Sequence, residues 1–308
     1  MAGKRTEVRP FGPEAIALAA ELIRDGQPVA VPTETVYGLA ADATDARAVA
    51  RIYEAKGRPS FNPLIVHVPD LAAAERLGTF DDKARALAEQ HWPGPLTLVV
   101  PLAANSPVAS LVTAGLPTVA LRVPAHPAMR ALLEAGGRPL AAPSANASGR
   151  ISPTRAAHVL ASLDGRIPLV IDGGQTALGV ESTIVALTGG APRLLRPGPI
   201  VVSEATTAAA DKVEAPGMLA SHYAPAKPLR LNVTEAAAGE WLIGFGPVAG
   251  DVSLSPSGDL AQAATRLFDL LHDADASASA AIAVAPVPDE GIGRAINDRL
   301  ARAAAPRS

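Results

Sequence analysis

Cysteine is absent from the 308 residues of this chain, and aromatic residues make up only 3% of it. Without thiols the chain can form no disulfide bond, no thiolate zinc site and no cysteine nucleophile, so serine, threonine, histidine and charged groups must carry any chemistry. The sequence contains no run of about 18 apolar residues that would span a membrane. The first ten residues carry Lys4, Arg5 and Arg9 without the apolar stretch of a signal peptide. We therefore expect a cytoplasmic protein with no membrane association.

The composition is that of a chain that buries a core. Hydrophobic residues make up 48% of the sequence and charged residues 19%, far from the composition of disordered chains. The length fits one large or two moderate domains. The net charge is −3, divided into +2 for residues 1–200 and −5 for residues 201–308. This balance argues against a surface devoted to nucleic acid, and it leaves room for a local basic pocket in the first part.

The spacing of apolar residues predicts an α/β protein. Helical periodicity predicts helices at residues 14–25, 46–56, 83–90, 127–135, 154–162, 260–272 and 293–304. Short apolar runs predict strands at residues 28–31, 64–68, 96–101, 118–123, 140–142, 169–172, 183–187, 229–233, 240–246 and 280–285. A polar turn is expected at residues 32–38. Because central strands tolerate proline poorly, the strands bounded by proline favour a twisted, mixed sheet.

The composition of the chain changes after residue 200, where proline and glycine recur in a stretch typical of a linker. We predict a first domain over residues 1–203, a linker over residues 204–228 and a small α/β domain over residues 229–308. The path of the alanine-rich residues 206–212 is not predicted. A plain spacer has no need of Met218, His222 and Tyr223, so the linker is a candidate to dock on a neighbouring surface.

Two cations flank a glycine at the end of the predicted helix 46–56. Lys56 offers a point-like ammonium and Arg58 a planar fork of donors, and the glycine between them lets the backbone approach an anion closely. A triphosphate is a natural ligand for this pair. The alternative is that both side chains lie in water and complement the negative end of the helix dipole.

Small polar residues follow two predicted strands. Ser144, Asn146 and Ser148 come after the strand 140–142 and suit a carboxylate, a phosphate or a metal-bound water. An ordinary capped turn is the alternative. The glycine-rich residues 173–183 are able to curl around phosphate, but they lack the ending of a Walker loop and the Rossmann fingerprint.

Charged or titratable residues inside apolar strands form a third group of candidates. A lone strand histidine such as His67 is more often structural than a ligand. Arg122 lies in the sequence Ala-Leu-Arg-Val-Pro, where a guanidinium should be paired or should meet an anionic ligand, which points to a carboxylate. Arg196 has the same character with less force. The other histidines show no metal-ligand spacing, so we assign no metal site built by protein side chains.

Four short motifs together resemble those of the YrdC-like threonylcarbamoyl-AMP synthases in order and spacing. They are Pro-Thr-Glu-Thr-Val-Tyr-Gly-Leu at residues 32–39, Lys56-x-Arg58, Ser144-x-Asn146 and Arg196-Pro-Gly198. The resemblance continues through Ser-His-Tyr-Ala-Pro at residues 221–225 and through residues 290–300, which are similar to the linker and C-terminal domain of the two-domain form. It covers nearly the whole chain.

The resemblance implies a fold and a reaction. The fold would be a YrdC-like twisted mixed sheet with flanking helices and a large concave cavity, followed by a small Rossmann-like α/β domain. The reaction would join L-threonine, bicarbonate and ATP, because the carbamate of threonine attacks the α-phosphorus and expels pyrophosphate, with Mg²⁺ on the phosphates. Such a displacement asks for positioning and charge neutralisation more than for a strong base.

The resemblance also implies which residues hold each substrate. ATP would be held by Lys56, Arg58, Asn62, Thr118, Asn146, Thr154, Arg196 and Tyr223, with Lys56 and Arg58 as the catalytic cations. Threonine would be held by Thr35, His67, Arg122, Ser144 and Ser182. His222 and Tyr223 would fold over the cavity and keep water from the labile product. The product would pass to a transferase that forms threonylcarbamoyladenosine in tRNA.

Two other functions compete with this one. A YrdC-like RNA-binding module would place the same cations on a phosphate backbone, but the near-neutral charge and the few aromatic residues disfavour binding that relies on base stacking. Only weak RNA binding is compatible with this composition. A carbamoyl-adenylate enzyme of the hydrogenase-maturation type would normally carry zinc-binding cysteines, and this chain has none.

Overall fold

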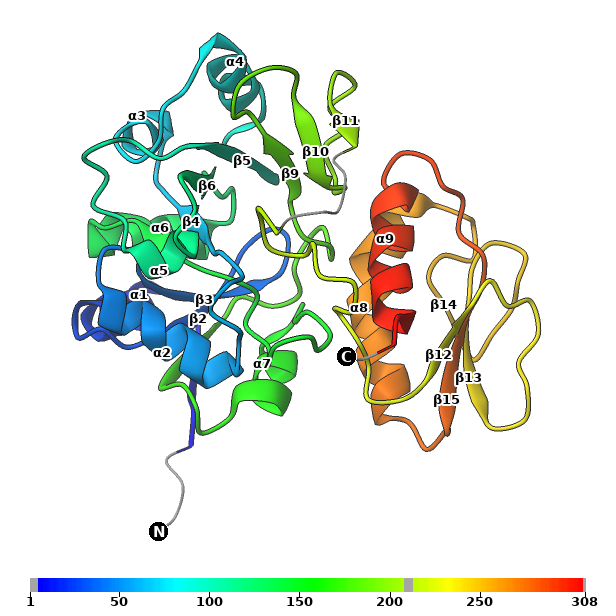
Figure 1. The fold of residues 1–308 in the computed structure, drawn as a ribbon. Coiled ribbons are helices and arrows are strands. Elements are labelled where there is room, and N and C mark those ends of the chain that lie inside the picture. Colours follow the sequence, from blue (N-terminus) through cyan, green and yellow to red (C-terminus); the bar gives the residue numbers. More distant parts are fainter. Residues whose placement is uncertain (1–4, 208–212, 307–308) are drawn as a thin grey trace.

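A large mixed sheet with helices on both faces and a small parallel sheet with two helices make up the fold (Figure 1). The structure is a computed structural model that describes residues 5–207 and 213–306. Its strands are β1 (Glu7–Pro10), β2 (Val29–Pro32), β3 (Tyr37–Asp42), β4 (Ile65–His67), β5 (Leu96–Pro101), β6 (Thr118–Arg122), β7 (Leu140–Ala141), β8 (Leu169–Asp172), β9 (Thr183–Ala186), β10 (Arg193–Arg196), β11 (Thr206–Thr207), β12 (Leu229–Leu231), β13 (Glu240–Gly244), β14 (Val252–Ser253) and β15 (Ala281–Val284). Its helices are α1 (Pro13–Arg24), α2 (Ala46–Lys56), α3 (Leu71–Glu75), α4 (Asp82–His91), α5 (Ser110–Thr113), α6 (Pro127–Gly136), α7 (Ala156–Leu163), α8 (Leu260–Ala276) and α9 (Gly293–Ala304).

The large sheet has the strand order β1-β8-β2-β3-β7-β4-β6-β5-β9-β10-β11 and mixes parallel with antiparallel pairs. Strand β4, for example, pairs in parallel with β6 and antiparallel with β7. In this register His67 lies opposite both Arg122 and Leu140. Because opposite residues of neighbouring strands point to the same side of a sheet, His67 and Arg122 share one face.

The two faces of the large sheet are covered in different ways. Helices α2, α4 and α7 contribute to the main core cluster on one face, and α1 and α6 pack with β2 and β8 on the other. The face of α1 and α6 continues over β4, β6 and β9, where Ala215 and Met218 of the linker cover Ile65 and Ala120. The cavity described below lies on this second face, between the helical cover and the linker.

Helix α2 carries the first cationic motif at its C-terminal end. The side chain of Asp45 caps the helix by accepting a hydrogen bond from the backbone N–H of Arg47. Gly57 ends the helix in the left-handed conformation, with φ 58°. The chain therefore turns sharply between Lys56 and Arg58.

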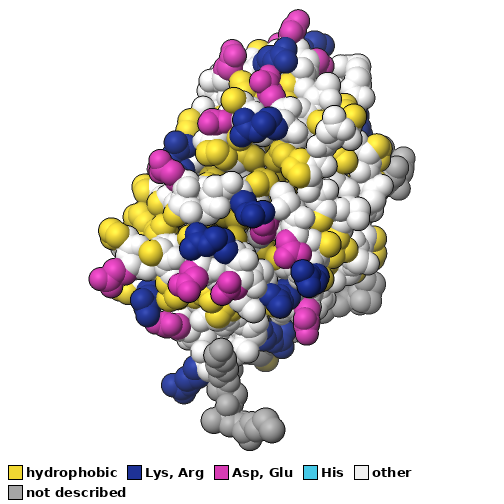
Figure 2. Space-filling view, turned by 90° about the vertical axis from the view of Figure 1, so that its left-hand side faces the viewer, with side chains coloured by type: hydrophobic (Ala, Val, Ile, Leu, Met, Phe, Trp, Pro, Cys, Tyr) yellow, Lys and Arg dark blue, Asp and Glu magenta, His cyan; other side chains and the backbone are white. Residues whose placement is uncertain are grey.

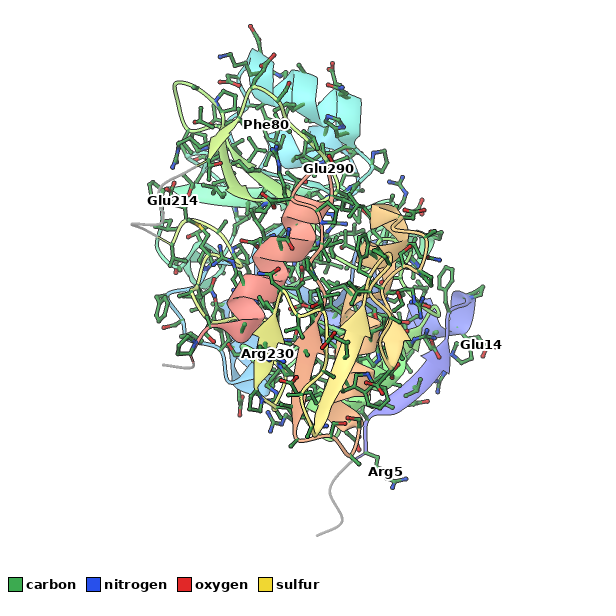
Figure 3. All side chains as sticks on the ribbon, turned by 90° about the vertical axis from the view of Figure 1, so that its right-hand side faces the viewer. Arg5, Glu14, Phe80, Glu214, Arg230 and Glu290 are labelled. Atoms are coloured by element: carbon green, nitrogen blue, oxygen red, sulfur yellow. The ribbon has the colours of Figure 1, made fainter. Side chains whose placement is uncertain are left out.

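The small domain is a four-stranded parallel sheet in the order β12-β15-β13-β14. Its helices α8 and α9 lie between this sheet and the large domain (Figure 1). Figure 3 views the small sheet from its outer side, with Glu290 at the end where α9 begins. Three strands precede α8, and β15 lies between α8 and α9 in the chain, so the strand–helix alternation of the expected Rossmann-like domain is present only in its second half.

The linker is held by both domains. The backbone N–H of His222 donates to the carbonyl of Arg302 on α9 at 3.1 Å, and Ala224 forms a β-bridge with Arg150 of the large domain. Strand β11 pairs with β10, so the large sheet extends past residue 203 into the residues predicted as linker. The other predicted domain boundaries stay predictions. Within the alanine-rich stretch, residues 208–212 lie outside the described residues.

One face of the large domain, on the left in Figure 1, is shown in space-filling form in Figure 2. Apolar side chains there lie between basic and acidic side chains, so this face carries no field of a single sign. No helix in residues 5–207 and 213–306 combines the length and the apolar character needed to cross a bilayer.

The α/β fold class and the predicted elements are confirmed, apart from small shifts such as α7 beginning at Ala156. The polar turn predicted at residues 32–38 is wrong at both ends, because β2 includes Pro32 and β3 begins at Tyr37. Strand β3 is buried over its whole length and reads Tyr-Gly-Leu-Ala-Ala-Asp. It therefore lacks the alternation by which a half-exposed strand is recognised. The short elements β1, β10, β11, β14, α3 and α5 were likewise missed.

Candidate active site

A small cavity with a volume of about 40 Å³ opens on the face that carries His67 and Arg122. The turn between β2 and β3, the ends of β4, β6 and β10, the loops around β7 and β9 and the linker surround it. Eight residues predicted to hold substrates line it, namely Thr35, Arg58, His67, Arg122, Ser144, Ser182, Arg196 and Tyr223. The fold thus brings together residues from eight separate segments of the sequence.

Lys56 and Arg58 are buried beside this cavity. They are only 3% and 8% exposed, so the alternative that both lie in water at the end of α2 is wrong. The Lys56 ammonium donates to the backbone carbonyls of Ser144 and Asn146. Burial, and then the neighbouring Arg58, lower the pKa of Lys56 well below its usual range. Burial also lowers the pKa of Arg58 to about 10. Both shifts show that the site penalises positive charge until an anion compensates it.

Arg196 is a third buried cation at the cavity. Its guanidinium donates to the backbone carbonyl and to the hydroxyl of Ser182, each at 3.0 Å. In the described part of the chain, Lys56, Arg58 and Arg196 donate to carbonyl and hydroxyl oxygens, and none of them forms an ion pair. Because buried charge is costly unless it is compensated, three such cations define an anion-binding site.

Arg122 differs from these three cations because it has an acidic partner. Its Nη2 lies 2.5 Å from Oε1 of Glu34, and its Nη1 donates to the hydroxyl of Thr35 at 3.0 Å. The sequence predicts a carboxylate partner for Arg122, and in the structure Glu34 of the same chain is that partner. Burial acts to raise the pKa of Glu34, but Arg122 and several hydrogen bonds outweigh it and lower this pKa. The pair is therefore ionised, and Arg122 and Thr35 both line the cavity.

Buried polar atoms without a hydrogen-bond partner gather around the cavity. Among the described residues they include both amide atoms of Asn62, Nδ1 of His67, Oδ1 of Asn146 and Nδ1 of His222. Each unpaired buried group costs about 1–3 kcal/mol, so this concentration indicates a place where a ligand or water completes the bonding. His67 is neutral, because burial and then Arg122 lower its pKa to about 3. Its unpaired nitrogen favours a ligand-facing role over the structural one.

Five predicted residues lie outside the cavity lining. Lys56, Asn62 and Asn146 adjoin it through their contacts with lining residues. Thr118 lies four residues before Arg122 on β6, about 13 Å along the strand but on the same face. Thr154 is fully buried, and its hydroxyl lies 3.3 Å from Nδ1 of His158.

Sequence reasoning missed three charged residues at the site: Glu34, Glu181 and Arg299. Glu181 precedes Ser182, and its Oε2 lies 2.8 Å from Nε of Arg299 on α9. All three lay within or beside motifs already singled out at residues 32–39, 173–183 and 290–300. Their proximity to the cavity was not visible, because each pairs with a residue at least 88 positions away.

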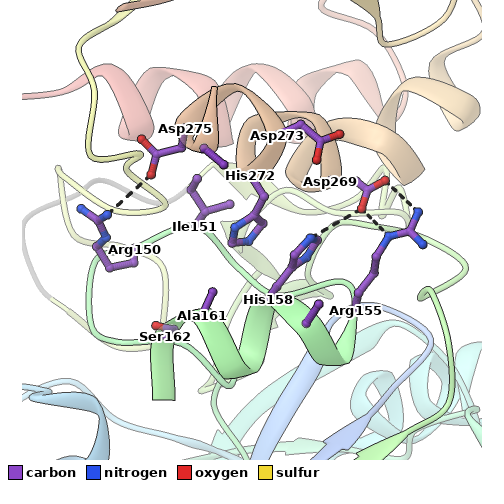
Figure 4. Close-up of a pocket in the computed structure, with 12 residues that line it drawn as sticks. Arg150, Ile151, Arg155, His158, Ala161, Ser162, Asp269, His272, Asp273 and Asp275 are labelled. Atoms are coloured by element: carbon purple, nitrogen blue, oxygen red, sulfur yellow. Dashed lines mark hydrogen bonds and ion pairs between the residues drawn. The ribbon is translucent and has the colours of Figure 1, made fainter. Parts of the chain in front are cut away.

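A second pocket lies between α7 and α8, at the junction of the domains (Figure 4). Its arginines are paired, since Arg155 contacts Asp269 at 2.5 Å and Arg150 lies 3.6 Å from Asp275. The rings of His158 and His272 stack with centroids 3.8 Å apart. Burial, and then His272, lower the pKa of His158 to about 3, so its imidazole is neutral. None of the residues predicted to hold substrates lines this pocket.

The described residues contain no group of three or more His, Asp or Glu side chains able to hold a metal ion. At the cavity, the carboxylates of Glu34 and Glu181 are both engaged by arginine. Oxygen ligands that Mg²⁺ prefers are therefore not gathered there by protein side chains.

The fold and the cavity define a class of protein: a twisted mixed α/β sheet that encloses a buried, positively charged small-molecule site, joined to a small parallel α/β domain. The chain belongs to the Sua5/YciO/YrdC family, whose model, described as "Telomere recombination", matches residues 21–198. A second family model, described as "Threonylcarbamoyl-AMP synthase, C-terminal domain", matches residues 193–305.

Similar proteins share both domains. The chain is 42% identical to a threonylcarbamoyl-AMP synthase of Bacillus subtilis, over 95% of this chain and 93% of that protein. It is 39% identical to a threonylcarbamoyl-AMP synthase of Pyrococcus abyssi, over 95% and 94%. A crystal structure of Pyrococcus abyssi Sua5 complexed with L-threonine has a TM-score of 0.88 and 38% identity, and covers 97% of this chain and 96% of that one. A structure of the same protein with neighbouring histidine and tyrosine residues changed to alanine also has a TM-score of 0.88, with 37% identity.

Proposed function

We propose that this chain is a threonylcarbamoyl-AMP synthase that joins L-threonine, bicarbonate and ATP and releases pyrophosphate. Relatives of that name align along nearly its whole length, and a similar structure contains L-threonine. The observation that carries the proposal is the set of three buried cations, Lys56, Arg58 and Arg196, which form no ion pair within the described structure. A polyanion such as the triphosphate of ATP supplies the charge that these residues lack.

The two substrates divide the cavity according to charge. The triphosphate lies at Lys56, Arg58 and Arg196, which also neutralise the negative charge that grows on the departing pyrophosphate. The unpaired amide of Asn62 and the unpaired Oδ1 of Asn146 lie next to these cations and complete the nucleotide site. Three further residues are proposed to contact ATP. Thr118 and Thr154 lie outside the cavity lining, and Tyr223 lines it from the linker.

Threonine lies at Arg122, whose Nη1 donates to the hydroxyl of Thr35, and both residues line the cavity. His67, Ser144 and Ser182 offer one imidazole and two hydroxyl groups around this position. A neutral imidazole and small hydroxyls recognise a polar amino acid without adding charge. The carboxylate of threonine would then share the guanidinium with Glu34.

The reaction follows from this placement. The amine of threonine and bicarbonate condense to the carbamate and water. A carbamate oxygen then bonds to the α-phosphorus while the bond from that phosphorus to the bridging oxygen of pyrophosphate breaks. Holding the nucleophile and the phosphate in contact supplies much of the rate enhancement, and no strong base is required. Mg²⁺ enters, in this proposal, with the phosphates of ATP and supplies charge neutralisation there.

His222 and Tyr223 close the cavity on the linker side. They are 7% and 1% exposed, and their rings meet edge to face at 4.1 Å. The sequence contains a single His-Tyr pair, and a pair of this kind was altered in the similar Pyrococcus abyssi structure. We expect the pair to exclude water from the mixed anhydride until the product passes to a tRNA threonylcarbamoyl transferase.

The RNA-binding alternative has less support. The cations that would meet a phosphate backbone are buried, and the face in Figure 2 mixes basic with acidic side chains. An RNA strand binds to exposed basic surface, which neither observation provides.

The experiment that tests the proposal uses the purified full chain with ATP, Mg²⁺, L-threonine and labelled bicarbonate. We expect pyrophosphate release that depends on threonine, with the label recovered in an adenylate. Cleavage of ATP at the same rate without threonine would exclude the proposed function. Salt-sensitive RNA binding without ATP turnover would favour the RNA-binding module instead.

A further inference from the structure

Arg299 is a buried cation that the C-terminal domain extends into the large domain. It lies on α9, and its side chain is 0% exposed. Its Nε donates to Oε2 of Glu181 at 2.8 Å, across 118 positions of sequence. Its Nη1 donates to the carbonyl of Pro197 at 2.9 Å. The only domain of the chain without proposed substrate contacts therefore reaches the wall of the cavity.

Each contact of Arg299 in the large domain or linker lies on or beside a residue proposed to bind substrate. Glu181 precedes Ser182, and Pro197 follows Arg196. The guanidinium carbon of Arg299 lies 5.4 Å from the centre of the Tyr223 ring. A planar guanidinium is able to fix several partners at once, which a single point charge cannot do.

Tyr223 needs such support because its backbone is strained. Its φ is 61°, in the left-handed region that a residue with a side chain seldom adopts. The ring also packs near Phe268 of α8, with centroids 5.7 Å apart. The C-terminal domain therefore supplies contacts that hold this linker residue in place.

Glu181 connects Arg299 to the cavity, because it pairs with Arg299 and lines the cavity wall. Burial acts to raise its pKa, but Arg299 and then Arg196 outweigh it and lower this pKa, so the carboxylate is ionised. Its Oε1 also accepts a hydrogen bond from Ser152 at 2.5 Å. A buried ion pair of this kind is seldom more stable than an apolar pair of equal volume, so stability alone does not account for it.

We propose that Arg299 is a positioning residue for adenylate formation, through which the C-terminal domain fixes Ser182, Arg196 and Tyr223 around the substrates. The expected change in kcat rests on the proposed function. The expected change in the linker does not. Arg299 acts through these neighbours and is not assigned a contact with substrate.

The test compares four full-length proteins: wild type, Arg299→Met, the double variant Glu181→Gln/Arg299→Met, and the control Arg294→Met. Arg294 lies on the same helix and is exposed. The single variant leaves Glu181 buried without its cation and is expected to lower the Tm. The double variant removes both charges and restores the Tm, so it separates folding from positioning.

In the double variant we expect kcat to fall about 10²-fold, because a small misplacement of reacting groups has effects of this size. The KM for threonine is expected to stay near that of the wild type, since Arg122 is untouched. Amide hydrogen exchange of residues 213–225 should become about tenfold faster without any substrate, and the control should match the wild type in all three measurements.

A wild-type kcat in the double variant, or unchanged exchange in residues 213–225, would overturn the proposal. If the wild type itself lacks threonine-dependent pyrophosphate release, the proposed function fails, and the exchange measurement alone decides whether Arg299 fixes the linker. Arg299→Lys supplies the last comparison, since it keeps the charge opposite Glu181 and loses the fork. We expect it to retain the Tm and to recover only part of kcat.

Discussion

The two pockets of this protein hold similar kinds of residues in opposite electrostatic states. In the pocket between the domains, Arg150 and Arg155 each face an aspartate, and the stacked imidazole of His158 is neutral (Figure 4). At the cavity of the large sheet, Lys56, Arg58 and Arg196 are buried and form no ion pair within the described residues. The arginines of the first pocket need no ligand to balance their charge, and the cations of the second do. Unmatched buried charge, more than pocket size, therefore marks the candidate active site.

The sharpest way to break this comparison is to remove one cation from each pocket. Arg58→Met should lower kcat/KM for ATP about 10²–10³-fold, the usual effect of losing one transition-state donor. Its free energy of unfolding should not fall, because a buried charge without an acidic partner is removed. Pyrophosphate release and chemical denaturation measure the two quantities.

Arg155→Met is the matched control for that experiment, since Arg155 is paired with Asp269 and lies outside the cavity. It should keep the activity of the wild type. Equal losses of activity in the two variants would contradict the contrast between the pockets.

Within the cavity, loss of the paired cation Arg122 should raise the KM for threonine more than the KM for ATP. Replacing both members of the pair, Glu34→Gln with Arg122→Met, avoids leaving a buried charge alone. The KM for threonine should rise about 10–100-fold, which corresponds to one hydrogen bond between charged groups. The KM for ATP should change less. Steady-state kinetics with each substrate varied in turn decide the matter, and a larger change in the KM for ATP would show that Arg122 serves the nucleotide.

Acid should destabilise the pocket between the domains. The pKa of His158 is about 3 in the folded state, below the 6.5 of an unperturbed histidine, so the unfolded state binds a proton first as the pH falls. The stability contributed by the neutral imidazole is therefore complete above pH 6.5 and is lost as the pH falls toward 3. The loss amounts to about 1.4 kcal/mol per pH unit for one histidine. His158→Gln should reduce the pH dependence of the unfolding free energy by that amount between pH 6 and pH 4, and an unchanged slope would show that His158 titrates normally in the folded protein.

The smallest effect is expected where a paired charge is half exposed. Asp269→Asn weakens the contact with Arg155, whose side chain is 46% exposed, so solvent screening limits the loss to about 1 kcal/mol of unfolding free energy or less. The activity should be that of the wild type. A marked loss of activity at unchanged stability would indicate that the pocket between the domains also binds a substrate.

Local patterns in the sequence were enough to predict the helices of eight or more residues and most strands. They failed for β3, because a strand covered on both faces shows no alternation, and for two-residue strands such as β11 that depend on a neighbour for their hydrogen bonds. Eight residues that the family resemblance assigned to substrate, among them Arg58, His67 and Arg122, line the cavity.

The sequence could not reveal which of these residues are paired. Arg122 meets Glu34, and Arg299 meets Glu181, only after the chain has folded over 88 and 118 positions. Burial is equally non-local, which is why Lys56 and Arg58 were compatible with a solvated helix end. Only the tertiary structure shows whether a cation is paired with a carboxylate of the chain or needs an anionic ligand.

A crystal structure of the full chain with ATP, Mg²⁺ and L-threonine tests the central claim most directly. The account predicts phosphate oxygens within hydrogen-bonding distance of Lys56 and Arg58, and the threonine carboxylate at Arg122, with the pocket between α7 and α8 free of nucleotide. Phosphates bound at Arg150 and Arg155, with Lys56 and Arg58 still donating only to the protein, would contradict it.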